Sequence, residues 1–430
     1  MKLSKRTWAS FLLIGLAGQF AWTIENMYFN VYLYNTISEN PGYIALMVAS
    51  SAIVATLTTF VMGALSDRAA RRKPFICIGY ILWGLSTMSF GLISVDNAAR
   101  LFPAANSVAV AAATLIIMDC IMTFFGSTAN DAAFNAYVTD TTTTGNRGRV
   151  ESVLAVLPLL AMLIIFGLFD PLTQKGEWQK FFNIFGVIVT LTGIISIFLL
   201  KHEETDRTGD ANERYLLSLI HGFKPSVIRS NPSIYLALLA LGIFAIAQQV
   251  FFPYLIIYMQ HYLKIDDYAI VLGVVLIFAS IVSVIGGGFI DKIGKIRFLL
   301  PSAVIMFAGL VAMFFVRTMV TAIIAGCIMM SGSMLVSATL SAIVRDHTPA
   351  DKVGHFQGIR MIFYVLLPMV IGPFIGAAVI MNSDSTYVEL GVVKSVPTPS
   401  IFLAAAAVLL LVAVPVLVLG KREKEKGKVI

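Results

Sequence analysis

Charged residues are scarce in this chain of 430 residues. Asp, Glu, Lys and Arg make up 13% of it, while hydrophobic residues make up 58%. A soluble domain carries about 25% charged residues, and many apolar runs here exceed the roughly 18 residues that span a bilayer. We therefore predict an all-α polytopic membrane protein. The net charge of +7 reflects where basic residues lie relative to the membrane, and we do not expect nucleic-acid binding.

Cysteines and catalytic motifs are also few. Cys77, Cys120 and Cys327 all fall inside apolar runs, so the sequence predicts neither a disulfide framework nor a metal site. No segment resembles a nucleotide loop, a catalytic triad or a zinc site. The glycines at 286–288 are not followed by Lys-Ser and indicate close helix packing instead. We therefore expect no cofactor, no catalytic residues and no enzymatic activity.

Hydropathy and span length predict twelve transmembrane helices. Their approximate bounds are 7–34, 43–65, 74–95, 107–138, 150–170, 180–200, 232–260, 268–290, 298–316, 319–344, 354–381 and 400–420. The start of the chain could pass for a signal peptide, but its apolar pattern continues to Tyr34, which is too long for a cleaved segment. An even number of spans places both termini on one side of the membrane.

The distribution of basic residues predicts which side that is. With both termini inside, the inner segments hold 24 Lys and Arg residues and the outer segments hold 6, with Arg360 inside a span. Inner loops carry the excess of positive charge. We therefore expect both termini in the cytoplasm of a cell that carries this protein in its plasma or inner membrane.

The longest polar connection divides the chain in two. We predict an N-terminal six-helix bundle at 1–200, a cytoplasmic linker at 201–231, a C-terminal six-helix bundle at 232–420 and a cytoplasmic tail at 421–430. Within the linker, residues 215–220 have the pattern of a short interfacial helix.

The two halves repeat one another without inversion. The matched pairs are Gly63 with Gly287, Asp67 with Asp291 and Glu25 with Gln249 at an offset of 224 residues, and Asp140 with Asp346 at an offset of 206. Two parallel six-helix repeats are the architecture of one transporter class.

The segment 63–73, Gly-Ala-Leu-Ser-Asp-Arg-Ala-Ala-Arg-Arg-Lys, carries a family resemblance. It resembles the signature loop between the second and third helices of the major facilitator superfamily, and the resemblance covers nearly the whole chain. Within that superfamily, segments 71–76 and 130–149 most resemble the glycoside–pentoside–hexuronide cation symporters and the related sucrose carriers. The resemblance implies a monomeric secondary transporter.

The same resemblance implies a cytoplasmic gate. A carboxylate at position 67 would meet the N-terminus of span eleven near Gly354, where the helix dipole favours negative charge. Its repeat copy would act on span five in the same way. The alternative is a solvated charge cluster that only sets topology. The expected gating residues are Gly63, Asp67, Arg68, Arg71, Asp140, Arg149, Asp291 and Lys292.

Polar side chains within spans are the candidates for substrate binding, because burying them in hydrocarbon is costly. Amide, carboxylate and aromatic groups on one helix face suit a polyhydroxylated small molecule. The alternative is helix packing through polar contacts. The expected substrate residues are Gln19, Trp22, Glu25, Asn26 and Asn30 in span one, Gln248, Gln249 and Phe252 in span seven, and Arg360 in span eleven.

Acids in span four are the candidates for ion coupling. Asp119, Thr123, Ser127 and Asn130 fall within about 80° of one another at 100° per residue, and Asp131 lies at the edge of this face. The symporter resemblance places a coupling cation near Asp131. The family's sodium site also uses acids in the second helix, and span two has none.

The missing acids favour protons over sodium as the coupling ion, carried by Asp131, Asp119 or Glu25, because a buried acid can bind and release a proton. The alternative for Asp131 is a structural ion pair with Arg149. Arg360 has two alternatives, holding a substrate group or neutralising Asp131.

These observations predict proton-coupled symport of a sugar or glycoside by alternating access. Two alternatives stay open. One is a proton-coupled exporter of lipophilic drugs or of a lipid-linked glycoside, for which the many Phe and Met residues leave room. The other is a membrane sensor that transports nothing.

Overall fold

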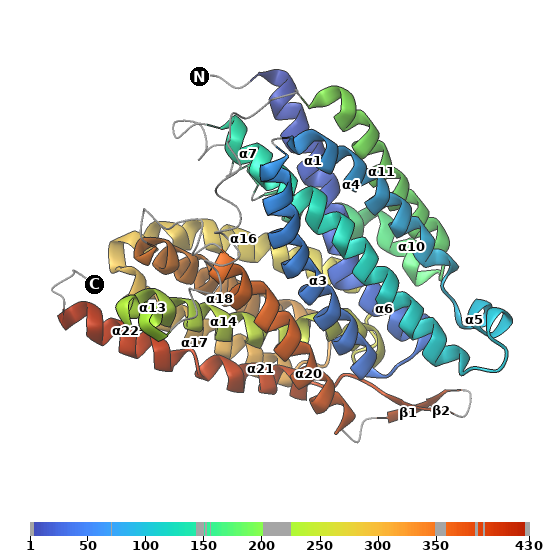
Figure 1. The fold of residues 1–430 in the computed structure, drawn as a ribbon. Helices are drawn as coiled ribbons and strands as arrows, with labels where there is room; N and C mark the ends of the chain where they lie inside the picture. The colour runs from blue at the N-terminus through green and yellow to red at the C-terminus, as the bar shows by residue number, and fades with distance from the viewer. Residues whose placement is uncertain are drawn as a thin grey trace. The chain divides into compact units, whose positions relative to one another are not determined.

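The computed structural model describes residues 4–69, 71–142, 150, 153–154, 156–200, 225–348, 358–382, 386–389 and 392–425 (Figure 1). Across these residues the chain is almost entirely helical. Twelve helical stretches are long and apolar enough to cross a membrane, which confirms the predicted fold class. Their bounds are Lys5–Ile37, Pro41–Ser66, Arg72–Leu92, Ser107–Thr141, Leu157–Gln174, Trp178–Leu199, Pro232–Tyr262, Tyr268–Gly287, Lys295–Phe314, Met319–His347, Gly358–Met381 and Ser400–Glu425.

The first six spans are built from α-helices that several π-helical turns interrupt. The α-helices are α1 (Lys5–Thr23), α2 (Phe29–Tyr32), α3 (Pro41–Arg68), α4 (Arg72–Ser89), α5 (Val95–Leu101), α6 (Ser107–Gly126), α7 (Asn135–Thr141), α9 (Leu157–Ile164), α10 (Asp170–Gln174) and α11 (Trp178–Leu199). The π-helical turns are Ile24–Tyr28, Leu33–Ile37, Ser127–Phe134 and Ile165–Phe169, and a 3₁₀ turn covers Phe90–Leu92.

The last six spans follow the same scheme. Their α-helices are α13 (Pro225–Ser230), α14 (Pro232–Phe251), α15 (Leu255–Ile257), α16 (Tyr268–Ile293), α17 (Lys295–Phe314), α18 (Met319–His347), α20 (Leu367–Met381), α21 (Ser400–Leu410) and α22 (Ala413–Glu425). The π-helical turns are Tyr258–Tyr262 and Ile362–Leu366, and a 3₁₀ turn covers Phe252–Tyr254.

A short hairpin joins α20 to α21. Strand β1 (Thr386–Glu389) pairs antiparallel with β2 (Val392–Ser395), with Thr386 opposite Ser395 and Glu389 opposite Val392. Strands of four residues are too short to be identified from hydropathy.

The chain divides into two compact units. The first contains residues 1–38 and 50–216, and the second contains residues 39–49 and 217–430. The first turns of α3 therefore belong with the second unit, where the Tyr254 hydroxyl donates to the carbonyl oxygens of Pro41 and Pro373. Most of the predicted linker, including the helix expected at 215–220, lies outside the described residues.

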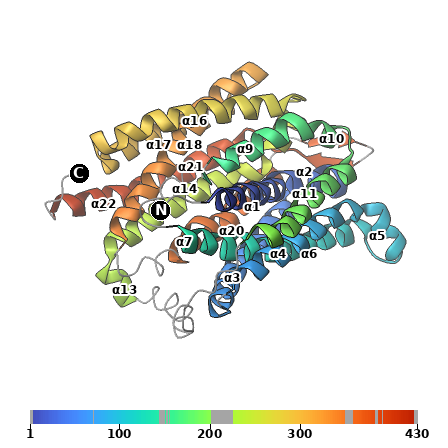
Figure 2. The same ribbon diagram turned by 90° about the horizontal axis from the view of Figure 1, so that it is seen from above.

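Small residues let helices of the first unit touch through their backbones. Figure 2 shows α4 beside α11, and the two pack along much of their length. A Cβ built on Gly84 would lie 2.5 Å from the amide nitrogen of Thr190, and one built on Gly193 would lie 2.7 Å from that of Ile81. Close approach through small residues is how helices associate in membranes, because lipid supplies no hydrophobic driving force between them.

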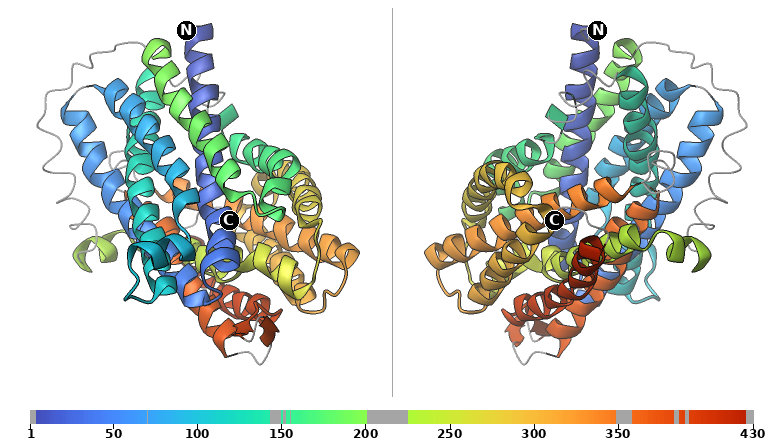
Figure 3. Two further views of the ribbon diagram at one scale, coloured as in Figure 1. Left: turned by 90° about the vertical axis from the view of Figure 1, so that its right-hand side faces the viewer. Right: turned by 90° about the vertical axis from the view of Figure 1, so that its left-hand side faces the viewer.

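The second unit packs in a similar way. Helices α16, α17 and α18 lie together, coloured yellow to orange in Figure 3. A Cβ built on Gly309 would lie 2.8 Å from that of Met329. On the outside, large apolar side chains such as Val284, which is 80% exposed, cover the helices. This is an exterior suited to lipid.

Candidate functional site

Two acids meet in the interior of the first unit. Glu25 lies in the π-helical turn of span one, is 7% exposed, and accepts a hydrogen bond from the Thr123 hydroxyl at 2.9 Å. Asp119 on α6 is 1% exposed and accepts from Ser51 of α3. Glu25 Oε2 and Asp119 Oδ1 have no hydrogen-bond partner among the described residues.

These acids have no cationic partner in the part of the chain that the structure describes. The ion pairs there involve other carboxylates, and Asp119 and Asp131 both act electrostatically on Glu25. An unpaired charge inside a membrane protein is costly. The Glu25–Asp119 pair is therefore a place where a bound proton would relieve both repulsion and desolvation. No group of three His, Cys, Asp or Glu forms a metal site in the described ranges.

Asp131 forms a second acid centre farther along span four. The Ser127 hydroxyl donates to its Oδ2 at 3.1 Å, and the Asn130 amide donates to its Oδ1 at 3.4 Å. The Tyr80 hydroxyl of α4 donates to Asn130 Oδ1 at 3.0 Å, which orients that amide. The alternative partner Arg149 lies outside the described residues.

The helical geometry of span four differs from our assumption of 100° per residue. Residues Ser127–Phe134 form a π-helical stretch, in which each turn holds one residue more. Asp131 therefore stands in line with Ser127, while Asn130 turns toward Tyr80. Glu25 also lies in a π-helical turn. Such turns occur often at functional sites, and hydropathy alone does not reveal them.

The predicted substrate stripe of span one is largely tied to its own helix. Gln19, Trp22 and Asn26 are half-buried, and Asn30 is fully buried. The Asn26 amide donates to the Trp22 carbonyl and the Asn30 amide to the Asn26 carbonyl, both at 2.8 Å. The Trp22 ring packs against Trp83 with centroids 5.0 Å apart. In each of these two asparagines the side-chain oxygen and one of the two amide N–H groups remain for a ligand.

The three predicted substrate residues of span seven have different environments. The Gln248 amide donates to the Ser333 hydroxyl of α18 at 2.6 Å, which fits helix packing. The Cβ of Gln249 lies 2.5 Å from a Cβ built on Gly372, so this glutamine fills the contact with α20. Phe252 is half-buried in a 3₁₀ turn.

Arg360 is half-buried near the start of span eleven. Its guanidinium donates to the Ser341 hydroxyl at 3.4 Å and lies 5.5 Å from the centre of the Tyr364 ring. Its Nε has no hydrogen-bond partner, and no acid pairs with it among the described residues. It can bind an anionic or hydroxyl-rich group.

Among its described residues, the segment predicted to form the gate contains one buried ion pair. Arg72 Nε lies 3.3 Å from Asp140 Oδ2, and both side chains are 8% exposed. Arg72 also donates to the Ser66 hydroxyl at 2.7 Å. Asp140 thus pairs with Arg72. Arg71, one of the expected gating residues, is exposed and stands at the N-cap of α4 in an extended conformation.

The second unit has a corresponding ion pair between Lys295, which matches Arg71 at the offset of 224, and Asp346, with exposures of 28% and 50%. Gly63 is not tightly enclosed, since a Cβ built on it would meet only Ala132 Cβ at 3.9 Å among the described atoms. The side chains of Asp67, Arg68, Asp291 and Lys292, together with Arg149 and Gly354, lie outside what the structure describes.

The sequence did not predict two buried charged residues that form side-chain contacts, Arg72 and Asp170. The expected gating residues include Arg71 and Arg68 but not Arg72. Asp170, 1% exposed, accepts from the Tyr28 hydroxyl and from the Gln174 amide, both at 2.8 Å. An acid at the end of a predicted span was the available signal for Asp170.

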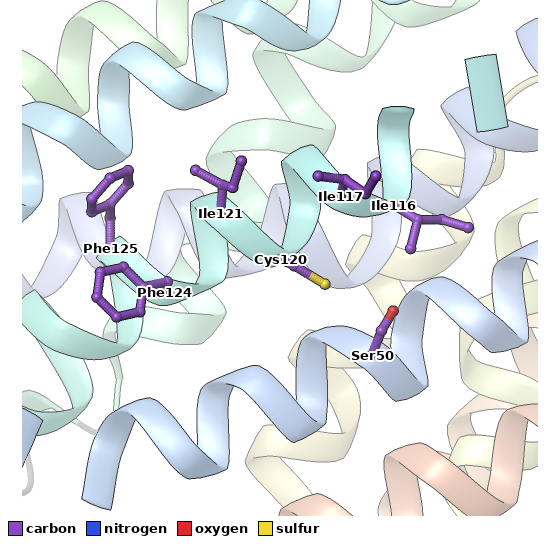
Figure 4. A pocket seen from close by; sticks show the side chains of 7 residues that line it. All are labelled: Ser50, Ile116, Ile117, Cys120, Ile121, Phe124 and Phe125. Carbon is purple, nitrogen blue, oxygen red and sulfur yellow. The ribbon is translucent and has the colours of Figure 1, made fainter. Parts of the chain in front are cut away.

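An apolar groove of about 580 Å³ lies between α3 and α6 (Figure 4). Its lining residues are Ser50, Ile116, Ile117, Cys120, Ile121, Phe124 and Phe125. The Cys120 thiol and the Ser50 hydroxyl point toward each other across it. Two of these residues, Cys120 and Ser50, directly adjoin Asp119 and Ser51 in the sequence, so the groove is close to the acid pair.

The sequence matches the family described as Major Facilitator Superfamily over residues 11–373. No curated protein matches it. Among solved structures, the nucleoside transporter NupG is 12% identical with a TM-score of 0.67, covering 96% of this chain and 97% of that one. The xylose transporter XylE from E. coli is 14% identical with a TM-score of 0.66, covering 94% and 97%.

A bacterial homolog of the human lysosomal transporter Spinster has the same fold. It is 12% identical with a TM-score of 0.68, covering 98% of both chains. At such identities the likeness concerns the fold alone.

Proposed function

Since the chain belongs to the major facilitator superfamily, we propose that it imports a sugar or glycoside together with protons, by alternating access around a central site. Its place in this family makes it a multi-pass membrane transporter of small molecules rather than an enzyme. What we propose beyond this is the class of the substrate and the identity of the coupling ion.

One observation carries proton coupling. Glu25 and Asp119 are buried beside each other, each with one unpartnered oxygen, and no cation of the described residues neutralises them. A site that holds a proton in one conformation and releases it in another converts a proton gradient into transport. Span two supplies the Ser51 hydroxyl and no acid, which favours protons over sodium.

Two features support a sugar-like substrate. NupG is a nucleoside transporter and XylE a xylose transporter, and both of these substrate classes present sugar hydroxyls. In this chain Asn30 Oδ1 and Glu25 Oε2 are acceptors without partners among the described residues, and Arg360 is a donor without an acid. The glycoside–pentoside–hexuronide branch is our proposed placement within the superfamily.

The remaining assignments belong to the same proposal. Both termini lie in the cytoplasm, the protein resides in the cell membrane as a monomer, and the units at 1–200 and 232–420 rock about the site, joined by the linker at 201–231. The segment around Gly63 and Asp67 and its repeat copy act as cytoplasmic gates. The positive-inside asymmetry of the sequence supports the orientation.

A second candidate is export of lipophilic drugs or of a lipid-linked glycoside. The observation in its favour is the apolar groove beside α6, with Ile117 61% exposed on its wall. Such a groove would accept an acyl chain or an apolar ring system more readily than a sugar.

Two measurements test the proposal. Thermal unfolding of the purified protein with a panel of sugars, glycosides, glycolipids and lipophilic cations identifies the ligand, since saturation at 100 Kd stabilises by about 2.7 kcal/mol. Uptake of the stabilising sugar into proteoliposomes is then driven by an imposed proton or sodium gradient. Accumulation with the proton gradient alone supports the proposal. Stabilisation only by amphiphiles selects the export alternative, and accumulation only with sodium refutes proton coupling.

A further inference from the structure

Four polar residues recur at every fourth position along span four. They are Asp119, Thr123, Ser127 and Asp131. The two ends of this row are the two acid centres, and the two middle members are hydroxyls. The Thr123 hydroxyl donates to Glu25, the partner of Asp119, and the Ser127 hydroxyl donates to Asp131.

These two hydroxyls behave unlike most others in the helices of this protein. A helical Ser or Thr usually donates to the backbone carbonyl one turn earlier. The neighbouring Thr128 does so, toward Phe124 at 2.7 Å, as does Thr114 toward Val110 at 2.8 Å. Thr123 and Ser127 direct their protons to carboxyl groups instead. A hydroxyl bonded in this way can accept one proton and pass on another.

The π-helical stretch limits the drift of this row at its last step. In an α-helix each four-residue step over-rotates by about 40°, so a row of this spacing drifts around the helix. The wider turn that begins at Ser127 counters this drift before Asp131. No hydrogen bond joins Thr123 to Ser127 among the described residues, and this four-residue step rises by about 6 Å. A single water molecule can bridge that distance.

The other polar groups that face this row already form hydrogen bonds. Ser51 donates to Asp119, and Tyr80 donates to Asn130, whose amide in turn donates to Asp131. No lysine or arginine of the described residues pairs with any of the three acids. The row therefore connects acids only to acids, through hydroxyls.

We propose that Thr123 and Ser127 relay protons between the Glu25–Asp119 pair and Asp131. In each transfer a carboxyl O–H gives its proton to a hydroxyl oxygen, and the hydroxyl releases its own proton toward the next acceptor. One proton leaves one acid and one proton arrives at the other. This inference rests on the proposed proton coupling and adds its path.

The test follows the carboxyl groups themselves by infrared spectroscopy after a rapid pH change, with the full-length protein in liposomes. The substitutions Glu25→Gln and Asp131→Asn assign the two acid bands. We expect Thr123→Val and Ser127→Ala each to slow proton exchange by about tenfold or more at the acid centre that receives its protons through the relay. The other centre should keep the wild-type rate. The variants Thr123→Ser and Ser127→Thr keep a hydroxyl and should restore the rate.

The control is Thr128→Val, which removes a hydroxyl that bonds only to the backbone. Wild-type exchange rates in Thr123→Val or Ser127→Ala would overturn the relay, and so would equal slowing in Thr128→Val. Proton coupling itself is tested separately by sugar accumulation in Asp131→Asn. Lost accumulation in that variant with unchanged exchange in the hydroxyl variants removes the relay and keeps the proposed function.

Discussion

The repeat places two versions of one ion pair in the same chain, and they should contribute very different amounts to stability. Arg72 and Asp140 join the start of α4 to α7 in the first unit, and Lys295 and Asp346 join α17 to α18 in the second. We consider Asp140→Asn and Asp346→Asn, which remove one negative charge each and keep the size of the side chain.

The exposures set the expected magnitudes. Both members of the first pair are 8% exposed, whereas those of the second are 28% and 50% exposed. Removing one partner of a buried pair costs about 3–5 kcal/mol. Breaking a solvent-exposed pair costs about 0–1 kcal/mol. Asp140→Asn should therefore destabilise the protein by at least about 2 kcal/mol more than Asp346→Asn.

The assay is unfolding of both purified variants in one detergent, at equal protein concentration and in two salt concentrations. We expect a clear loss of stability for Asp140→Asn that added salt changes little, because buried charges are poorly screened. Asp346→Asn should unfold near the wild type. Equal losses in the two variants would refute the assignment of the Arg72–Asp140 pair as a buried structural contact.

Three further substitutions have defined outcomes. Tyr28→Phe removes one donor to the buried Asp170 and should cost about 1–3 kcal/mol of unfolding free energy, seen as a lower unfolding temperature. Gly84→Val places a side chain against the backbone of α11 and should prevent recovery of monodisperse protein, whereas Gly167→Ala, with no atom within 4 Å of its Cβ, should not. Arg360→Leu should weaken binding of the stabilising sugar in thermal-shift titrations by about tenfold. It should leave the protein folded, because the guanidinium makes only one weak hydrogen bond to the described residues. Unchanged affinity would remove Arg360 from the substrate site.

The number and order of the spans could be predicted from the sequence because hydropathy depends on residue type alone. Glu25 and Asp119 could be named for the same reason, since an acid in an apolar run is conspicuous at any position. The sequence could not predict that these two acids lie together, because this depends on how span one packs against span four. The choice of Arg72 over Arg71 also depends on the exact residue at which α4 begins.

The π-helical turns account for most of the remaining differences. They change which face of a span a residue occupies, and so they moved Asp131 into line with Ser127 and turned Asn130 toward Tyr80. No residue type marks such a turn, because it arises from packing against neighbouring helices. The amide groups of Asn26 and Asn30 show the same limit, since bonding to their own helix competes with ligand binding.

The most direct test of proton coupling compares two transport modes in one variant. Glu25→Gln keeps the shape of the side chain and removes its ability to carry a proton. We predict that proteoliposomes with this variant lose uphill sugar accumulation under an imposed pH gradient but still exchange labelled for unlabelled sugar across the membrane. Full accumulation in the variant would contradict coupling through the Glu25–Asp119 pair.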